Sequence, residues 1–248
     1  METVLELQNI SHSYHSTEGE TPALKDLTFT LKKGEFVCIV GPSGCGKSTL
    51  LSIITGLLKP EQGTVQLHGK NIGYMLQKDH LLEWRTVYHN VVLGLEIQRV
   101  LTSEKKQKAY ELLDKYGLKD FTNAKPSELS GGMRQRAALV RTLVLDPDLL
   151  LLDEPFSALD YQTRLEVADD IGQIIKREQK TAILVTHDLA EAVSMGDRVI
   201  VLTSRPGSIK TIVPLTFPLD LDTPLLRRET LEFNHYFQII WKELNEHA

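Results

Sequence analysis

The stretch Phe36-Val-Cys-Ile-Val-Gly-Pro-Ser-Gly-Cys-Gly-Lys-Ser-Thr49 decides the fold of this chain, and an apolar helical pattern follows it over residues 50–54. Its five leading apolar residues predict a strand buried on both faces. Residues 41–48 then match the phosphate-binding pattern G-x-x-x-x-G-K-[S/T]. Glycines let backbone N–H groups converge on phosphate oxygens, and the following helix directs its positive end to the same point. Strand, glycine loop and helix therefore predict a nucleotide site.

Within this loop, Lys47 is expected to place a positive charge near the β- and γ-phosphates, and Ser48 to offer its hydroxyl to Mg²⁺. A glycine-rich turn that matches the pattern by chance is the alternative, which the flanking strand and helix disfavour. The residues expected to cradle the nucleotide are Gly41, Pro42, Ser43, Gly44, Cys45, Gly46, Lys47, Ser48 and Thr49.

Composition restricts the class of protein. The chain has 248 residues, of which 42% are hydrophobic and 25% charged, enough for one large α/β domain with a filled core. The formal net charge of −5 argues against a general nucleic-acid-binding surface. Cys38 lies in the buried strand and Cys45 in the phosphate loop, so a disulfide is not expected and a reducing cytosol fits best. The N-terminus lacks a signal-peptide pattern, and no apolar run approaches the roughly 20 residues that cross a bilayer.

Three segments, 3–8, 24–31 and 63–69, alternate apolar and polar residues, which predicts an antiparallel sheet beside the nucleotide-binding core. Tyr14 lies between the first two of these segments. Its ring can stack on an adenine face, with ordinary packing as the alternative.

Residues 71–77 read as a strand that ends at Gln77. From there the spacing of the apolar residues changes. Apolar residues at helical spacing over 109–116 predict a helix that Gly117 ends. We therefore expect residues 78–145 to form a mainly helical subdomain inserted into the core.

A second marker, Leu129-Ser-Gly-Gly-Met-Arg-Gln-Arg136, follows at the end of this subdomain. Ser130 is expected to cap a helix that runs to about Leu145. Gly131 and Gly132 in its first turn each cost roughly 1 kcal/mol relative to alanine. That cost is understandable if the backbone there must approach a ligand.

Four leucines over residues 149–152 predict another buried strand, and two carboxylates follow it. Ligands of open α/β sheets bind at the carboxyl ends of the strands. Asp153 is therefore expected to hold Mg²⁺ or its water ligands, and Glu154 to polarise the water that attacks the γ-phosphate. The alternative is a pair of solvated acids.

Ser157-Ala-Leu-Asp160 precedes a long amphipathic helix that we expect to reach Gln179. Residues 181–186 predict a core strand that ends at His187, so His187 and Glu154 are expected to meet over one nucleotide. Residues 199–202 predict the last parallel strand, followed by a turn and short hairpin over 205–214 and a single helix over 225–246.

Taken together, these motifs resemble the nucleotide-binding subunits of ATP-binding cassette (ABC) transporters over nearly residues 3–205. The resemblance implies an α/β fold of ABC ATPase type: a P-loop NTPase core with a mostly parallel sheet, an antiparallel β subdomain and the inserted helical subdomain. It also implies one nucleotide-binding domain over 1–248, closed by a C-terminal hairpin and helix over 206–248.

The family further implies that two subunits face head to tail and enclose ATP and Mg²⁺ between the phosphate loop of one and the Leu-Ser-Gly-Gly turn of the other. Ser130, Gly131 and Gly132 then reach the γ-phosphate of the partner's ATP. Glu154 is the implied general base and His187 the implied γ-phosphate contact. The remaining implied roles are Gln77 as a metal contact linked to the membrane partner, Asp160 as a signal across the dimer and Tyr14 as the adenine platform.

Residues 81–91, Met133-Arg-Gln-Arg136 and Ser204-Arg-Pro-Gly-Ser-Ile209 are similar to the nitrate/sulfonate/taurine importer group. Glu83 departs from the proline common at its position. The similarity implies a homodimer on the cytoplasmic face of the membrane that drives permease subunits and, indirectly, an extracellular solute-binding protein, without nucleic acid. Leu81, Leu82 and Trp84 are then expected in the groove that receives a permease helix, with the core of the helical subdomain as the alternative.

Two other classes of cassette ATPase remain open. An exporter subunit is disfavoured by the Trp84 segment and the Arg-Pro-Gly turn. A soluble ATPase acting on ribosomes or DNA typically carries two cassettes or a long coiled coil, which 248 residues do not hold. A GTPase or small-molecule kinase lacks the Leu-Ser-Gly-Gly turn, and no Asn-Lys-x-Asp guanine reader is present.

Overall fold

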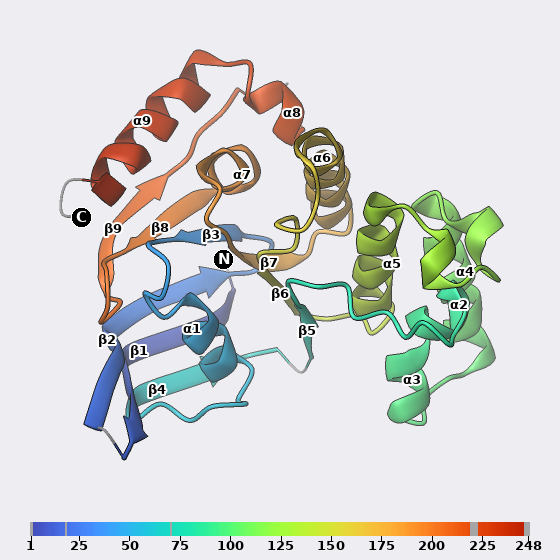
Figure 1. Ribbon diagram of the computed structural model, residues 1–248, viewed down its shortest axis with the longest axis horizontal. Coiled ribbons are helices and arrows are strands. Elements are labelled where there is room, and N and C mark those ends of the chain that lie inside the picture. Colours follow the sequence, from blue (N-terminus) through green and yellow to red (C-terminus); the bar gives the residue numbers. More distant parts are fainter. Residues whose placement is uncertain (1, 18, 70, 219–222, 246–248) are drawn as a thin grey trace.

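The larger sheet of the computed structural model positions the phosphate loop (Figure 1). The structure describes residues 2–17, 19–69, 71–218 and 223–245. The strand order is β5-β6-β7-β3-β8-β9, parallel from β5 to β8 and antiparallel between β8 and β9. These strands are β5 (Ile72–Met75), β6 (Leu149–Asp153), β7 (Thr181–Val185), β3 (Phe36–Val40), β8 (Arg198–Leu202) and β9 (Ile209–Pro214).

Strand β3 lies inside this sheet, and all five of its residues are buried. Alternate residues face two different apolar clusters: Cys38 and Val40 pack toward the helices, whereas Val37 and Ile39 pack toward the second sheet and the helix that follows the phosphate loop. A strand covered on both faces must be apolar throughout, which confirms the prediction made from the run of apolar residues. Cys38 is a free, buried thiol here, as is Cys45 in the loop.

The second sheet is antiparallel, with the order β2-β1-β4. Its strands are β1 (Thr3–Ser16), β2 (Gly19–Lys32) and β4 (Gln62–Leu67). The predicted antiparallel sheet is confirmed, but the position of Tyr14 between two strands is wrong, because Tyr14 lies in β1 and pairs with Thr21 of β2. The register shifts at several points after Leu7, which interrupts the apolar alternation and hides the rest of the strand in the sequence.

The described elements between β5 and β6 are all helical, and Figure 1 shows them to one side of the sheets. They begin after Met75 and end before Leu149, and we call this segment the helical insertion. Gly117, with φ 72°, follows the C-terminal end of α4, one of its two 13-residue helices, as the sequence predicts. The elements are α2 (Val87–Val91), α3 (Leu93–Ile97), α4 (Ser103–Lys115), η1 (Lys119–Phe121), η2 (Pro126–Glu128) and α5 (Gly131–Leu143).

Helices on the other connections complete the layers: α1 (Lys47–Ile54), α6 (Tyr161–Arg177), α7 (Leu189–Met195), α8 (Pro224–Arg227) and α9 (Leu231–Asn245). The single helix predicted over 225–246 is wrong, because α8 and α9 are separate, and residue 246 lies outside the described residues. The hydroxyl of Thr230 accepts a bond from Phe233 N at 3.1 Å and so begins a new helix. None of the helices in the described ranges has the length and apolar character needed to span a membrane.

Candidate active site

The phosphate loop adopts a backbone that needs glycine at Gly46. This residue precedes α1 with φ 99°, in the left-handed region. A Cβ there would lie 2.7 Å from Leu24 Cδ2 and 2.8 Å from Ala23 O, so β2 presses against the loop. Conformation and close packing therefore both demand glycine at this position.

Lys47 directs a buried ammonium group toward the loop. It is only 7% exposed, and its Nζ donates to Gly41 O at 2.8 Å and to Pro42 O at 3.1 Å. Cys45 Sγ lies 3.9 Å from the same nitrogen, and burial raises the pKa of this thiol, so it stays neutral. These hydrogen-bond partners carry no negative charge, so the ammonium group can still bind an anion.

A cavity of about 490 Å³ opens over this loop. Tyr14 stands at its rim with its ring half exposed and its hydroxyl 3.1 Å from Thr49 Oγ1. The cavity thus joins the phosphate loop to residues from five other parts of the chain. Its described lining consists of Tyr14, Ala23, Ser43, Gly44, Gly46, Lys47, Ser48, Thr49, Glu154, His187 and Arg205.

Glu154 and His187 meet in this cavity, as the strand ends predict. They follow the neighbouring strands β6 and β7, and His187 Nδ1 lies 3.1 Å from Glu154 Oε2. A carboxylate only accepts, so the imidazole donates through Nδ1. Glu154 has φ 45°, an unusual backbone for glutamate, which is held by its N–H bond to Val185 O at 2.8 Å. Such strain is typical of functional positions.

Asp153, the last residue of β6, directly precedes Glu154. Burial raises the pKa of its carboxyl above the usual value, while hydrogen bonds from Tyr74 and Ser48 oppose that shift. Tyr74 OH donates to Asp153 Oδ2 at 3.1 Å, a partner that the sequence reading missed although Tyr74 belongs to the strand predicted to end at Gln77. Burial and the neighbouring carboxylate together raise the pKa of Tyr74, so its proton stays in place.

The oxygen atoms of Ser48 and Asp153 are the kind that Mg²⁺ prefers. No cluster of three or more His, Cys, Asp or Glu side chains able to hold a metal occurs in the described part of the chain. Ser48 and Asp153 would thus suit Mg²⁺ as two oxygen ligands beside the phosphate loop.

Gln77 stands apart from the described cavity lining. It is exposed, and its Nε2 donates to Ser157 Oγ at 3.1 Å, which joins the end of β5 to the turn after Glu154. The same segment is tied to α5, because Arg134 binds Asp79 at 2.9 Å and Glu83 at 2.8 Å. Glu83, where the resemblance implies a proline, thus has Arg134 as a partner.

Ser130 caps α5 as predicted, with its hydroxyl accepting from Met133 N at 3.3 Å. Gly132 is buried, and a Cβ there would lie 2.9 Å from Val167 Cγ2 of α6. A Cβ at Gly131 would lie 3.0 Å from Leu159 Cδ2. Helix packing therefore explains much of the glycine requirement that the sequence reading assigned to a ligand alone. This turn and Gln77 are not among the described lining residues of the cavity.

Asp160 caps α6 and is exposed. Its Oδ1 accepts from Thr163 N at 3.1 Å, and hydrogen bonds with Thr163 hold the pKa of its carboxyl below the usual value. It too lies outside the described cavity lining.

Arg205 lines the cavity and was missed as a site residue. Its Nε donates to Gly44 O at 3.1 Å. The turn that carries it is fixed to β2, because Gly207 N donates to Ala23 O and Lys25 N to Gly207 O, each at 2.9 Å. The signal in the sequence was a lone arginine before Pro-Gly, directly after the last parallel strand, where ligands of such sheets bind.

Comparison with known proteins identifies the family. The sequence model described as ABC transporter matches residues 24–157. An ABC transporter ATP-binding protein of Bacillus subtilis, YtlC, is 48% identical over 97% of this chain and 95% of its own. The taurine import ATP-binding protein TauB of Pelagibacter ubique is 44% identical over 85% of this chain and 82% of its own.

A solved structure agrees with these sequences. The ATP-binding cassette MJ0796, a dimer in a post-hydrolysis state with ADP and Pi, superposes with a TM-score of 0.73 at 32% identity. The match covers 86% of this chain and 100% of that one. The fold, the phosphate loop and the sequence relatives agree: the chain belongs to the ABC transporter family and is an ABC ATPase.

Proposed function

We propose that this protein is the energy-coupling subunit of a bacterial importer for a small solute of the sulfonate, taurine or nitrate type. The observation that carries the proposal is the cavity in which the phosphate loop faces the Glu154–His187 pair. The similarity to a taurine importer subunit supports the choice of solute class.

In the proposed mechanism, Lys47 and the loop N–H groups bind the phosphates, and Tyr14 stacks on adenine. Glu154 accepts a proton from the attacking water, and His187, already bonded to Glu154 at 3.1 Å, contacts the γ-phosphate. Ser48 and Asp153 would hold Mg²⁺, with Gln77 as a further contact, and the bound ion would supply positive charge beside the phosphate oxygens.

The proposed working unit is a homodimer in which each ATP is enclosed by two chains. Ser130, Gly131 and Gly132 lie outside the described cavity lining of their own chain, so a partner's turn is needed to cover the γ-phosphate. Closure on ATP and opening after hydrolysis would drive the permease, with Asp160 relaying the state of one site to the other.

Ser130→Arg tests this composite site. Because the large side chain projects toward the partner's nucleotide, we expect ATPase turnover to fall at least tenfold while a single chain still binds ATP normally. Ser103→Arg, an equally bulky change at the exposed start of α4, is the matched control. Turnover and equilibrium binding of ATP measure the two effects separately; a loss of binding by Ser130→Arg would contradict the composite site.

Arg205 is proposed to bind the nucleotide phosphates beside Gly44. Its guanidinium keeps donors beyond the Nε bond to Gly44 O, so Arg205→Gln should weaken ATP and ADP binding about tenfold, the ~1.4 kcal/mol of one charge-assisted bond. Adenosine, which lacks phosphates, should bind both proteins alike. Arg99→Gln, at an exposed arginine of the helical insertion, is the control, and equal nucleotide affinities of the two variants would exclude this role.

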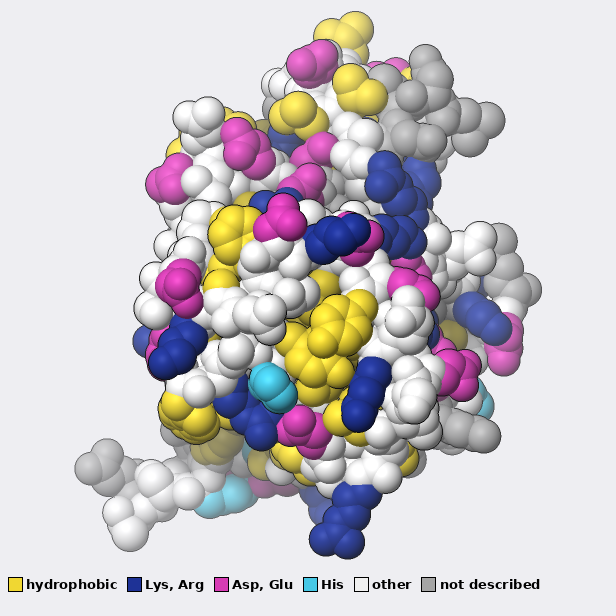
Figure 2. Space-filling view, turned by 90° about the vertical axis from the view of Figure 1, so that its right-hand side faces the viewer, with side chains coloured by type: hydrophobic (Ala, Val, Ile, Leu, Met, Phe, Trp, Pro, Cys, Tyr) yellow, Lys and Arg dark blue, Asp and Glu magenta, His cyan; other side chains and the backbone are white. Residues whose placement is uncertain are grey.

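The helical insertion is proposed as the permease-docking part of a single nucleotide-binding domain over 1–248, with its helical subdomain over 78–145 and a C-terminal hairpin and helices over 206–248. Figure 2 views this end of the molecule and shows hydrophobic side chains gathered at its centre among charged ones. Trp84 of the insertion is 75% exposed, which suits a partner helix. Leu81 instead is 6% exposed and packs in the core, so its predicted place in the groove is wrong, and Leu82 is partly buried.

The proposed location, on the cytoplasmic face of the membrane, and the proposed partners have a direct test. A tagged chain is purified from native membranes in mild detergent, and the proteins that accompany it are identified by mass spectrometry. A multi-spanning permease together with a solute-binding protein is the expected result. Recovery only with ribosomes, DNA or soluble proteins would leave an ATPase without a role in import.

A further inference from the structure

The segment that carries His187 is held by a buried polar contact. His187 itself is exposed, and it lies between Asp188 and Thr186, which is only 2% exposed. The hydroxyl of Thr186 donates to Glu191 Oε2 of α7 at 2.6 Å and accepts from Asp188 N at 3.0 Å. One hydroxyl, acting as donor and acceptor, therefore joins the residues on both sides of His187 to helix α7.

Backbone contacts complete this arrangement. Thr186 directly follows β7, and its N–H donates to Ile39 O of β3 at 3.2 Å. On the other side, Asp188 Oδ1 accepts from Ala190 N at 2.8 Å and from Glu191 N at 3.2 Å, so it caps α7. The exposed imidazole is thus carried by a short segment that the sheet holds at one end and the helix at the other.

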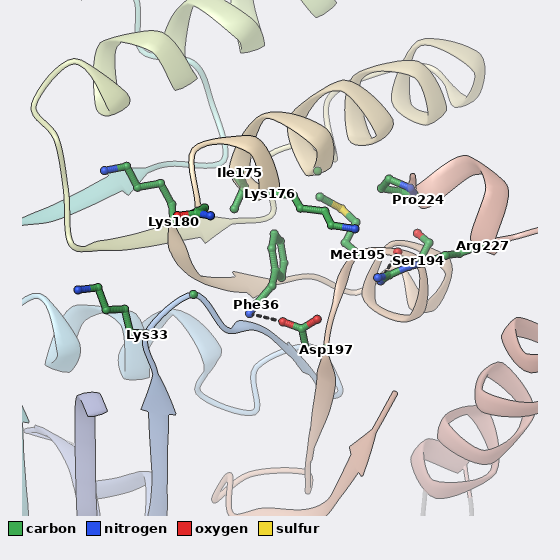
Figure 3. Close-up of a pocket in the computed structure, with 13 residues that line it drawn as sticks. Lys33, Phe36, Ile175, Lys176, Lys180, Ser194, Met195, Asp197, Pro224 and Arg227 are labelled. Atoms are coloured by element: carbon green, nitrogen blue, oxygen red, sulfur yellow. Dashed lines mark hydrogen bonds between the residues drawn. The ribbon is translucent and has the colours of Figure 1, made fainter. Parts of the chain in front are cut away.

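Helix α7 provides a fixed base for this contact. It packs against β3 and α9. Just beyond its C-terminal end, Asp197 Oδ2 accepts from Phe36 N at 2.8 Å, the bond that is drawn in Figure 3. Arg227 of α8 donates from Nη1 to the carbonyls of Ser194 and Gly196, each at 3.2 Å. A side chain on α7 can therefore hold the segment after β7 in one place.

Packing and helix capping do not account for Glu191. Its side chain is 3% exposed, and burial raises the pKa of the carboxyl to about 7, while the bond from Thr186 favours the ionised form. Burying a carboxyl costs free energy that burying an apolar side chain does not. Capping of α7 is already supplied by Asp188. The bond with Thr186 is therefore the feature of this position that an apolar residue could not replace.

We propose that Thr186 and Glu191 position His187 for ATP hydrolysis. This inference rests on the proposed role of His187 at the γ-phosphate. Glu154 is fixed independently, by its N–H bond to Val185 O at 2.8 Å. The 3.1 Å distance from Glu154 Oε2 to His187 Nδ1 therefore depends on where the segment after β7 lies. With that segment in place, Nδ1 donates to the carboxylate, which leaves Nε2 for the nucleotide.

The first test removes the hydroxyl of Thr186 and keeps its shape. Thr186→Val should lower kcat for ATP hydrolysis at least about tenfold, because rate depends steeply on position, while ATP affinity stays within about twofold. Thr186→Ser, which keeps the hydroxyl, should retain most of kcat. Thr181→Val is the matched control and should turn over ATP normally. Thr181 begins β7, is also 2% exposed, and its hydroxyl accepts from Gly34 N at 3.0 Å.

Glu191 offers a second pair of variants, whose folding does not depend on that of Thr186→Val. Glu191→Gln keeps an oxygen that accepts from the Thr186 hydroxyl, so it should retain most of kcat. Glu191→Met has a similar length but no such acceptor, so it should lose kcat at least about tenfold. Thermal unfolding of each variant identifies the chains that are folded and can be compared. Equal kcat in Glu191→Gln and Glu191→Met would refute the role of Glu191.

The tautomer of His187 reports its position without depending on turnover. In the nucleotide-free chain at about pH 8.5, where an ordinary imidazole is neutral, the His187 ring should carry its proton on Nδ1. Two-bond ¹H–¹⁵N correlations of the histidine-labelled chain, assigned with His187→Ala, identify the tautomer. Thr186→Val should shift the ring toward the Nε2–H form, whereas Thr186→Ser and Thr181→Val should not. An unchanged tautomer in Thr186→Val would overturn the inference.

His187→Ala separates this inference from the proposed role of His187 itself. Both His187→Ala and Thr186→Val are expected to lose turnover, and Thr186→Val by no more than His187→Ala, since a misplaced imidazole is the smaller defect. Loss of turnover in His187→Ala with full turnover in Thr186→Val would refute the positioning and leave the role of His187 standing. Full turnover in His187→Ala would refute both.

Discussion

Glu154→Gln is expected to reduce ATP turnover by at least about 100-fold, the lower end of what a positioned general base contributes. The amide keeps the size of the carboxylate and its contact with His187 but cannot take a proton from water. ATP binding depends on Lys47 and the loop, so its affinity should stay within about twofold. Stopped-time assays of phosphate release and equilibrium binding of ATP measure the two quantities.

The same variant should accumulate the proposed dimer, because chains that bind ATP without hydrolysing it remain closed. Size-exclusion chromatography with ATP and Mg²⁺ would show a dimer for Glu154→Gln and mainly monomer for the unaltered chain after turnover. Glu166→Gln, at an exposed position on α6, is the matched control and should behave as the unaltered chain. A normal turnover rate in Glu154→Gln would remove Glu154 as the base.

The strands of the core could be predicted because their signal is local. The apolar runs in β3 and β6 follow directly from burial on both faces, and the positions of Glu154 and His187 follow from the rule that parallel strands end at one edge. The meeting of these two side chains, 33 residues apart in sequence, was therefore within reach of the sequence alone.

Features that depend on distant contacts could not be predicted in this way. Arg205 reaches the cavity only because its turn is bonded to Ala23 and Lys25 of β2, and nothing near Arg205 in the sequence encodes that contact. Tyr74 looks like any strand aromatic until the sheet places it beside Asp153. Likewise, the sequence suggested a ligand contact for Gly132, because the close packing of Val167 on α6 against it depends on the tertiary fold.

Lys47→Ala is expected to abolish measurable hydrolysis and to weaken ATP binding about 30- to 140-fold. The binding loss corresponds to the ~2–3 kcal/mol of charge-assisted hydrogen bonding that one buried cation provides to a phosphate. Hydrolysis falls further, because charge on the phosphate oxygens then develops without the ammonium that Gly41 and Pro42 hold in place.

The structure also predicts that Lys47→Ala loses ATP binding and hydrolysis without unfolding. Lys47 is the first residue of α1, where alanine is a good helix former, and its removal relieves a buried charge whose oxygen hydrogen-bond partners are both neutral carbonyls. Thermal unfolding without nucleotide should therefore be unchanged or raised in Lys47→Ala, while the stabilisation that ATP adds should be largely lost. Lys59→Ala, at an exposed lysine, should keep turnover, affinity and the ATP-induced shift. Full turnover in Lys47→Ala would show that the ammonium is not part of the phosphate site, despite its burial beneath the loop.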